Sequence, residues 1–389
     1  MTATPAFAHS LTTLSFGLIC FAVTSGCGAH STGSRSAESR EGSEPTSTGA
    51  EPAASAARRG TGTLLVANKA EATLSFVDLA SGEVVATVPT GTGPHEVAVS
   101  PDGGTAAVAD YGAQAGGSTL TVVDVPRARV VRTVELGEHT RPHGIAFLDD
   151  RRVAVTTEGS GSLLLVDVEA GKVETAVPTG QRVSHMVALD PRRERAYVAN
   201  IGSGSMTVVD LAAGAKVADV ATGAGAEGIA VSPADGRVWV TNREADTVTA
   251  VDPESLEVVA TLPSKEFPIR AEATPDGRWV LVSNAESGTL TVIDARAAAV
   301  ARTVDLSMQP AGGDGRMFDD FGASSVPIGI EIAPDGKTAW IAHANADAVQ
   351  VVDLETWKPA GALTAGKEPD GMAHSPRTVE RPSADRRSP

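Results

Sequence analysis

A short phrase that ends in Val-Asp or Ile-Asp recurs seven times along the chain and limits its fold more than any other feature. The final aspartates of the phrase are Asp78, Asp124, Asp167, Asp210, Asp252, Asp294 and Asp353, so successive copies are 46, 43, 43, 42, 42 and 59 residues apart. A period of about 40 to 45 residues is typical of arrays in which each copy forms one small sheet. The sequence therefore predicts a repeat protein of seven similar units.

Each unit contains four short β-type runs separated by turn residues. In the second unit the apolar and β-branched runs are Glu96–Val99, Thr105–Ala109, Leu120–Val123 and Val130–Val134. A Pro-Asp-Gly sequence, which favours a tight turn, follows the first run and recurs in later units. Four-stranded units of this length are the signature of β-propeller blades.

The order of the runs predicts how the ring closes. The first unit begins with a strand of the second type at Leu64–Ala67, and the last ends with an isolated first strand at Gly371–Ser375. Seven complete blades result only if these two segments pair, which also removes an exposed sheet edge. We therefore predict an all-β fold: a seven-bladed β-propeller of four-stranded blades, closed by a C-terminal inner strand that joins the N-terminal blade.

The segments outside the repeats are predicted to be export and linker sequences. The apolar stretch from Leu11 to Val23 has the length of a signal peptide and is too short to span a bilayer. Thr-Ser-Gly before Cys27 resembles a bacterial lipobox, so we expect lipidation at Cys27, with simple secretion as the alternative. The predicted division is a signal peptide (1–27), a disordered tether (28–60), the propeller (61–376) and a disordered tail (377–389).

Composition narrows the classes of partner and cofactor. A net charge of −16 disfavours nucleic acid and anionic lipid, so contact with a membrane is expected only through an N-terminal lipid anchor. Both cysteines, Cys20 and Cys27, lie in the leader, so no disulfide and no thiolate metal site is expected in the mature domain. The sequence has no Cys-x-x-Cys-His motif, which predicts that no haem is covalently attached.

The repeat phrases resemble those of the YVTN (YncE-like) family of bacterial β-propellers. The resemblance is carried by Tyr197-Val198-Ala199-Asn200, by Thr207-Val208-Val209-Asp210 and by Pro94-His95 with Ser100-Pro101-Asp102-Gly103, and it covers residues 61–376. It implies the propeller fold. Similar propellers include lactonases, lyases, domains of denitrification enzymes and surface proteins without known activity, so the resemblance implies no single function.

Two irregular loops are predicted to lie on the same face of the ring. They are Tyr111–Gly117, between a second and a third strand, and Ser307–Ser325, between two blades. Long insertions on a rigid scaffold are frequent sites of function. We interpret the second loop as a candidate lid, with glycine-rich ends around Arg316, Phe318, Asp319 and Asp320.

The second residue of each inner strand is predicted to lie at the mouth of the central channel on that face. These residues, the mouth ring, are Asp370, His95, His143, His185, Glu227, Ile269 and Ile328. Three histidines between two carboxylates suit Zn²⁺, Fe²⁺ or Cu²⁺, or general acid–base chemistry. The candidate metal ligands are thus His95, His143, His185, Glu227 and Asp370, with a metal-free ligand pocket or a structural role as alternatives.

Two glutamates interrupt a set of alanines deeper in the inner strands. Glu272 and Glu331 occupy a position that is alanine in the five other blades. A buried carboxylate requires a partner, for which Arg270 and Arg316 are the candidates. The candidate catalytic residues are Glu227, Glu272, Glu331 and Arg270, and an ordinary ion pair in a hydrated channel is the alternative.

The second strands are predicted to end mostly in asparagine, with Glu158 and His343 as departures from that pattern. We interpret both as surface variation or as weak candidates for a second layer around the mouth.

These patterns favour an exported, membrane-tethered propeller that acts as a ligand-binding or protein-interaction module through its loop-rich face. A small ligand or an envelope protein is the expected partner, an extracytoplasmic lipid anchor the expected location, and a monomer the expected state. The alternative is a metal-dependent lyase or hydrolase, similar to the lactonases, with a His/Glu/Asp site at the channel mouth. The cofactor such a site would hold is a divalent transition metal, Zn, Fe or Cu.

Overall fold

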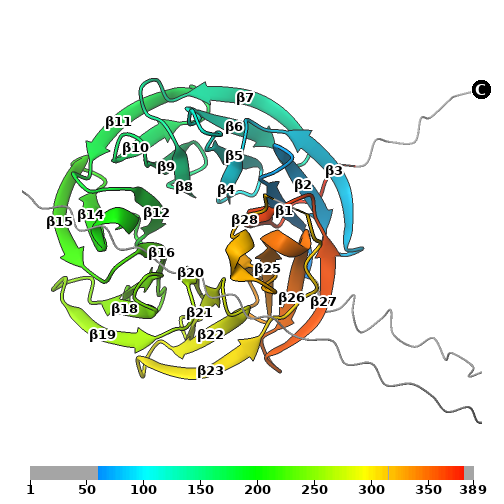
Figure 1. Ribbon diagram of the computed structural model, residues 1–389. Coiled ribbons are helices and arrows are strands. Elements are labelled where there is room, and N and C mark those ends of the chain that lie inside the picture. The colour runs from blue at the N-terminus through cyan, green and yellow to red at the C-terminus, as the bar shows by residue number, and fades with distance from the viewer. Residues whose placement is uncertain (1–59, 314, 381–389) are drawn as a thin grey trace, which may run out of the picture. The chain divides into compact units, whose positions relative to one another are not determined.

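A computed structural model describes residues 60–313 and 315–380. Within them, 28 strands form seven antiparallel sheets of four strands each, arranged as blades around a central channel (Figure 1). The predicted fold class is confirmed. The predicted signal peptide with Cys27, the tether up to residue 59 and the last nine residues of the predicted tail lie outside the described residues.

The four strands of a blade run in the predicted order from the channel outward. The inner strands are β28 (Pro369–Ser375), β4 (Pro94–Val99), β8 (Pro142–Phe147), β12 (Ser184–Leu189), β16 (Ala226–Val231), β20 (Pro268–Ala273) and β24 (Pro327–Ile332) of blades 1 to 7. The second strands are β1 (Thr63–Asn68), β5 (Thr105–Asp110), β9 (Arg152–Thr157), β13 (Arg195–Asn200), β17 (Val238–Asn242), β21 (Trp279–Asn284) and β25 (Thr338–His343).

The two outer positions of each blade complete the sheets. The third strands are β2 (Thr73–Asp78), β6 (Thr119–Asp124), β10 (Ser162–Asp167), β14 (Ser205–Asp210), β18 (Thr247–Val251), β22 (Thr289–Asp294) and β26 (Ala348–Asp353). The fourth strands are β3 (Glu83–Pro89), β7 (Arg129–Glu135), β11 (Lys172–Pro178), β15 (Ala215–Ala221), β19 (Val258–Pro263), β23 (Ala299–Asp305) and β27 (Lys358–Thr364).

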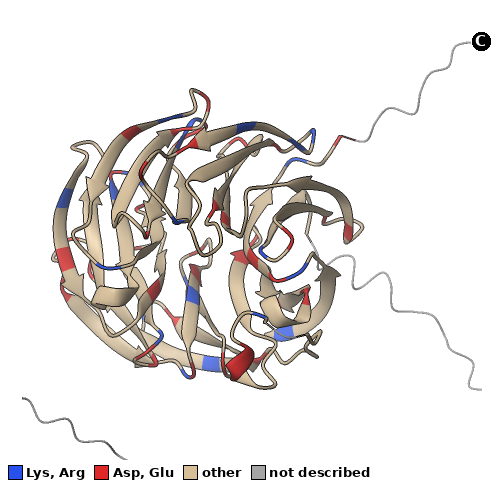
Figure 2. Ribbon diagram, turned by 45° about the horizontal axis from the view of Figure 1, so that its top comes forward, with Lys and Arg blue, Asp and Glu red and all other residues tan. Residues whose placement is uncertain are grey.

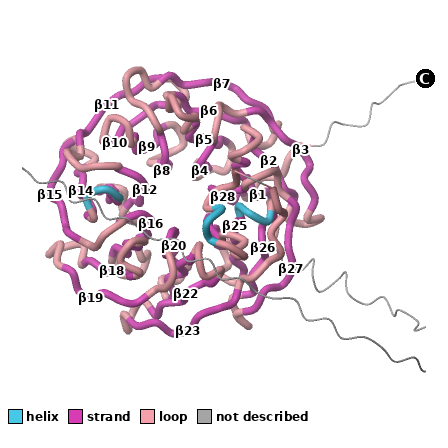
Figure 3. Tube along the Cα trace, viewed as in Figure 1, coloured by secondary structure: helices cyan, strands magenta, loops and turns pink. Residues whose placement is uncertain are grey.

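Within the described residues, helix is confined to three single-turn 3₁₀ segments in the loops (Figure 3): η1 (Ile201–Ser203), η2 (Asp319–Phe321) and η3 (Ala344–Ala346). No helix in the part of the chain that the structure describes is long and apolar enough to cross a membrane.

The ring closes in blade 1, where β28 pairs antiparallel with β1 and Leu65 lies opposite Ala373. The chain continues past the predicted end of the propeller, since Arg377 Nε donates to Asp102 O at 3.0 Å and Glu380 N donates to Pro126 O at 2.7 Å. The C-terminal segment is therefore fixed to both blade 1 and blade 2.

The hydrophobic core lies between the blades rather than at the channel. Alternate residues of the strands pack against the next blade, as Leu120 and Val122 of blade 2 do against Val155 and Leu164 of blade 3. Acidic and basic residues are interspersed around the ring, without separation into one acidic and one basic face (Figure 2). Because packing between blades is independent of the channel lining, the lining is free to vary from blade to blade.

Candidate functional site at the channel mouth

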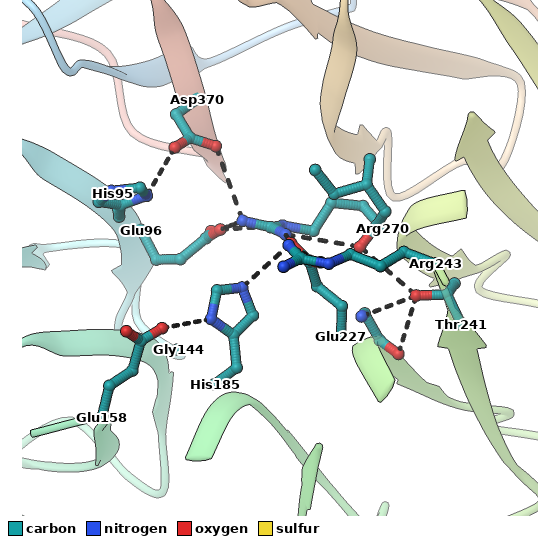
Figure 4. Close-up of polar contacts among 12 residues, drawn as sticks. His95, Glu96, Gly144, Glu158, His185, Glu227, Thr241, Arg243, Arg270 and Asp370 are labelled. Atoms are coloured by element: carbon teal, nitrogen blue, oxygen red, sulfur yellow. Dashed lines mark hydrogen bonds and ion pairs between the residues drawn. The ribbon is translucent and has the colours of Figure 1, made fainter. Parts of the chain in front are cut away.

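The five polar residues of the mouth ring form one continuous arc, of which Figure 4 labels Asp370, His95, His185 and Glu227. His95 Nδ1 lies 2.8 Å from Asp370 Oδ2, and His185 Nε2 lies 3.3 Å from Glu227 Oε1. The His143 ring lies between them, with its centroid 4.5 Å from that of His95 and 3.7 Å from that of His185. None of the five is more than 8% exposed. The structure brings these residues together in the predicted order.

A second set of residues, the rim ring, lies above the mouth ring. It consists of the residue that follows each second strand: Lys69, Tyr111, Glu158, Ile201, Arg243, Ala285 and Ala344. Strand β9 ends at Thr157, which pairs with Pro142, so Thr157 and not Glu158 occupies the position that is asparagine in other blades. The sequence alignment at Glu158 was wrong by one residue because this strand lacks the terminal asparagine.

The rim residues bind the polar arc from above. Glu158 Oε1 lies 2.5 Å from His185 Nδ1, and the Tyr111 hydroxyl donates to Glu158 Oε2 at 2.7 Å. Arg243 Nη1 donates to Glu227 Oε2 at 2.6 Å. The site thus includes Glu158, Tyr111 and Arg243. An alignment of the blades in the correct register would have identified all three.

The surroundings of His343, the other residue that departs from the asparagine pattern, indicate a structural role. Its Nδ1 lies 2.8 Å from Ser325 Oγ, and burial lowers the pKa of His343 to about 4.

One level below the mouth ring, most blades have no room for a side chain. The residue there is glycine in four blades, and a Cβ on Gly144 would lie 2.7 Å from the carbonyl oxygen of His185. Glu96 of blade 2 and Arg270 of blade 6 are the two charged exceptions. Arg270 crosses the channel to Glu96, with Nη2 2.7 Å and Nε 3.1 Å from Glu96 Oε1.

Arg270 also neutralises the carboxylates above it. Its Nη1 lies 3.5 Å from Glu227 Oε1, and its Nη2 lies 3.7 Å from Asp370 Oδ1. Burial raises the pKa of the Asp370 carboxyl, but His95 and Arg270 outweigh this effect and hold the pKa at about 2. The guanidinium therefore favours the ionised forms of Asp370 in blade 1 and Glu227 in blade 5.

The three histidines differ in charge state. Burial lowers the pKa of His95, despite the attraction of Asp370, and lowers the pKa of His143 further because His185 and His95 lie beside it. Burial also opposes the charged form of His185, but the contacts with Glu158 and Glu227 prevail and raise its pKa. Their surroundings thus favour the neutral form of His95 and His143 and the protonated form of His185.

Several buried polar atoms of the arc lack a hydrogen bond. His143 Nδ1 and Asp370 Oδ1 have no hydrogen-bond partner, and the carboxylates near His95 Nδ1 and His185 Nε2 are close enough for ion pairs but lie outside hydrogen-bond geometry. Buried polar atoms in folded proteins are nearly always bonded, to protein, water or an ion. The unpaired atoms of the arc are thus available to water, an ion or another ligand.

Two histidines and one glutamate are placed for metal binding. His143, Glu158 and His185 each offer one donor atom, and the three atoms lie within 4.8 Å of one another. Donors bound to a tetrahedral zinc ion are about 3.4 Å apart, so the three atoms would have to move closer together to share one ion. Of the other predicted ligands, His95 and Asp370 pair with each other, and Glu227 is held by two arginines.

The other half of the mouth is apolar. Ile269 and Ile328 of the mouth ring pack with the rim residues Ala285 and Ala344, and Phe267, Met317, Phe318 and Phe321 cover this cluster. The rings of Phe318 and Phe321 are stacked, with their centroids 4.8 Å apart.

The candidate lid therefore lies over the apolar half. Phe318 is its central contact, and Arg316 anchors it by donating to Ala344 O at 2.9 Å and to the Asp347 carboxylate. Asp319 and Asp320 are exposed in η2.

Below Arg270 the channel holds a cavity of about 530 Å³ that is lined by the inner strands of all seven blades. Glu272 and Glu331 line it, and neither pairs with Arg270 or Arg316, since Arg270 turns upward to Glu96 and Arg316 binds Asp347. The expected ion pair was therefore wrong. Burial raises the pKa of Glu272 to about 7 and, together with the charge of Glu272, raises that of Glu331 to about 8.

The fold and the arc together define a seven-bladed β-propeller with a buried polar centre at one channel mouth. Residues 21–153 match the model of the YNCE-like beta-propeller family, which confirms the resemblance carried by the repeat phrases. Residues 152–274 match the model of the Cytochrome D1 heme domain. Each model matches about one third of the chain.

Solved structures share the fold at low identity. Hydrazine synthase from Kuenenia stuttgartiensis aligns with a TM-score of 0.59 and 20% identity over 73% of this chain and 90% of its own. A functionally unknown protein from Desulfotomaculum acetoxidans DSM 771 aligns with a TM-score of 0.67 and 13% identity over 82% of this chain and 100% of its own. No curated protein matches the chain. At these identities the similarity concerns the fold alone.

Proposed function

We propose that this protein is an exported, membrane-tethered β-propeller that binds a divalent transition-metal ion in the polar half of the channel mouth. His143, Glu158 and His185 would hold the ion. The observation that carries the proposal is the approach of their three donor atoms to within 4.8 Å, with His143 Nδ1 buried and unpaired. Two imidazoles and one carboxylate are a ligand set that suits zinc and its neighbours in the transition series.

The surrounding residues support this arrangement. Carboxylates and hydroxyls that contact metal ligands fix their orientation, as Tyr111 would for Glu158 and Glu227 for His185. His95 and Asp370 belong to this outer layer, because each is the other's nearest charge partner. The predicted set of five thus divides into two ligands and three supporting residues, with Glu158 added.

Binding is better supported than the lyase or hydrolase alternative. Burial raises the pKa of Glu227, but His185 and the two arginines outweigh it and lower the pKa overall. A carboxylate that is held ionised by Arg243 and Arg270 is a weak proton acceptor. Glu227 is therefore better suited to fix charge at the mouth than to move a proton.

The match to a haem-domain model raises the question of whether a haem fits the mouth. The imidazoles of His143 and His185 lie face to face with centroids 3.7 Å apart, and three phenylalanines cover the apolar half. This packing leaves no slot for a macrocycle beside the histidines, whereas an ion requires only rotation of the side chains. The residues fit a metal ion better than a haem.

The test is a calorimetric titration of the mature full-length chain with Zn²⁺, with elemental analysis of the protein as purified. We expect one ion per chain, and we expect His143→Ala, His185→Ala and Glu158→Gln each to weaken binding by about a hundredfold or more. His139→Ala is the matched control, because His139 lies on the same face and contacts only Ser160 among the side chains. Failure to take up metal, or uptake that the three substitutions leave unchanged, would reject the proposal.

The location has its own test. The predicted signal peptide and Cys27 support attachment to the outer surface of the cell membrane, where the loop-rich face would meet a small ligand or an envelope protein. Mass spectrometry of the native N-terminus should find a lipid-modified Cys27. An unmodified start, or a start at another residue, would exclude the anchor.

A further inference from the structure

The proposed metal site has one free position. Four-coordinate zinc sites with three protein ligands bind water or another exogenous ligand at the fourth position. Beneath the site lies the Arg270–Glu96 pair, and its mouth-ring ligands His143 and His185 are buried. The rim residues Lys69, Tyr111, Glu158 and Arg243 are partly exposed. An exogenous ligand would therefore approach from the rim.

Lys69 is the rim cation that has no partner. Its backbone N–H donates to Glu368 O at 3.0 Å, but within residues 60–313 and 315–380 its ammonium makes no hydrogen bond or ion pair with a side chain. Asn68, the last residue of β1, lies opposite Pro369 of β28, so Lys69 stands next to the start of the strand that carries Asp370 of the polar arc. A partly buried ammonium without a partner is costly unless it meets an anion.

The other cations near the mouth are already paired. Arg243 donates to Glu227 and Arg270 donates to Glu96. Arg141 lies over the Tyr111 ring and donates to Gln114 O at 2.9 Å. Lys69 alone among these four has a side-chain donor group that is wholly free for a ligand.

The charges at the mouth indicate the sign of that ligand. Once His185 gives up its proton to bind the ion, the formal charges at the mouth are those of four carboxylates, Glu96, Glu158, Glu227 and Asp370, and of three cations, Lys69, Arg243 and Arg270, and their sum is 3 − 4 = −1. A divalent ion would change this sum to −1 + 2 = +1. A single negative charge would then make the cluster neutral, which is the state that burial favours.

We infer that a small monoanion completes the metal site and is held by the ion on one side and by Lys69 on the other. This inference rests on the proposed function and names its ligand class. The ligand must be small, because the aromatic rings along the polar half pack against one another, with neighbouring centroids 3.7 to 4.5 Å apart from Tyr111 through His95 and His143 to His185. Its chemistry is that of a hard, singly charged donor, such as a carboxylate group or a triatomic inorganic anion.

The experiment uses the mature full-length chain loaded with Co²⁺, whose visible absorption reports its ligands. Azide and formate are the probes, and perchlorate controls for ionic strength. We expect both probes to change the cobalt spectrum in a saturable way. Lys69→Met should raise the dissociation constant for azide about tenfold or more, the effect of losing a charge-assisted hydrogen bond, while the affinity for cobalt stays within about threefold.

Two further variants make the result specific. Lys69→Arg keeps the charge and should retain most of the azide affinity, and Lys69→Gln is measured beside Lys69→Met in case the latter does not fold. Lys367→Met removes an exposed cation from the same face and should leave both affinities unchanged.

The failures of the two proposals are distinguishable. If cobalt binds and azide leaves the wild-type spectrum unchanged, the anion site is overturned and the metal site stands. If azide binds the wild type and the uncharged Lys69 variants equally, the role of Lys69 is overturned. If cobalt does not bind, both proposals fall together.

Discussion

Blades 1 to 5 and blades 6 and 7 line the same channel with opposite polarity. In the first group the mouth-ring residue is charged or an imidazole, and the residue three positions deeper in the strand is alanine, as with His143 and Ala146. In the second group the order is reversed, with Ile269 above Glu272 and Ile328 above Glu331.

The two groups also treat their carboxylates differently. Those of the mouth ring, Asp370 and Glu227, meet Arg270 or Arg243, and their pKa values are lowered. Within the described residues Glu272 and Glu331 have no cationic partner, and burial raises their pKa values to about 7 and about 8. The contrast teaches that the charge state of a buried carboxylate in this ring depends on whether a guanidinium from another blade reaches it.

The largest expected effect comes from removing the residue that joins the two groups. Arg270→Met should lower the free energy of unfolding by about 3–5 kcal/mol at pH 8, because it leaves buried carboxylates without a counter-charge. The loss should shrink at pH 5, where those carboxyls can take up protons. Urea unfolding at both pH values measures it, with the exposed Arg278→Met as control. A loss below about 1 kcal/mol at pH 8 would mean that the mouth charges do not depend on this bridge.

The next largest effect is a difference in stability loss between substitutions in the two halves of the mouth, measured in the metal-free protein. Ile328→Ala should cost about 2–4 kcal/mol, because Ile328 is fully packed in the apolar cluster. His143→Ala should cost about 1 kcal/mol or less, because it also removes a buried nitrogen that has no hydrogen bond. Thermal or urea unfolding compares the two variants. Equal losses would show that the polar arc contributes to stability as much as the apolar half does.

The lower channel should make stability depend on pH. The pKa of Glu331 is raised to about 8 in the folded protein by burial, from an ordinary value of 4.5. Between these values the folded state binds more protons than the unfolded state, so the free energy of unfolding falls as the pH rises. Glu331→Gln should therefore stabilise the protein by about 1–3 kcal/mol at pH 9 and by almost nothing at pH 4.

Two comparisons sharpen the experiment on Glu331. Glu272→Gln should act in the same direction but less, because the pKa of Glu272 is raised only to about 7. The exposed Glu355→Gln should have no such pH profile. A gain from Glu331→Gln that is the same at pH 4 and pH 9 would contradict the unpaired state of this carboxyl.

The smallest effect concerns one hydrogen bond of the rim. Tyr111→Phe should cost about 0.5–1.5 kcal/mol, the usual value of a hydroxyl–carboxylate contact. Burial and Glu158 raise the pKa of Tyr111 to about 12, so the loss should be constant from pH 6 to pH 9. A pH-dependent loss measured by urea unfolding would show that the hydroxyl does not keep its proton in this range.

The mouth ring was predictable from the sequence because proline starts five of the seven inner strands, as Pro94 and Pro142 do, and thereby fixes their register. The rim ring was not predictable, because strand β9 ends in threonine instead of asparagine and Glu158 was therefore assigned to the wrong position. The partner of Arg270 could not be predicted from the sequence either. Glu96 is 174 residues away and contacts it only because the ring places blades 2 and 6 across the channel from each other.

The closure of blade 1 has a consequence for biosynthesis. Among the described strands, Lys69 follows the first and Asp370 belongs to the last. A chain whose translation has not reached Asp370 has the three histidines but lacks the carboxylate beside His95. The mouth ring is therefore complete only after the last described strand has been made and has joined β1, so the pair of His95 and Asp370 would mark chains whose ring has closed.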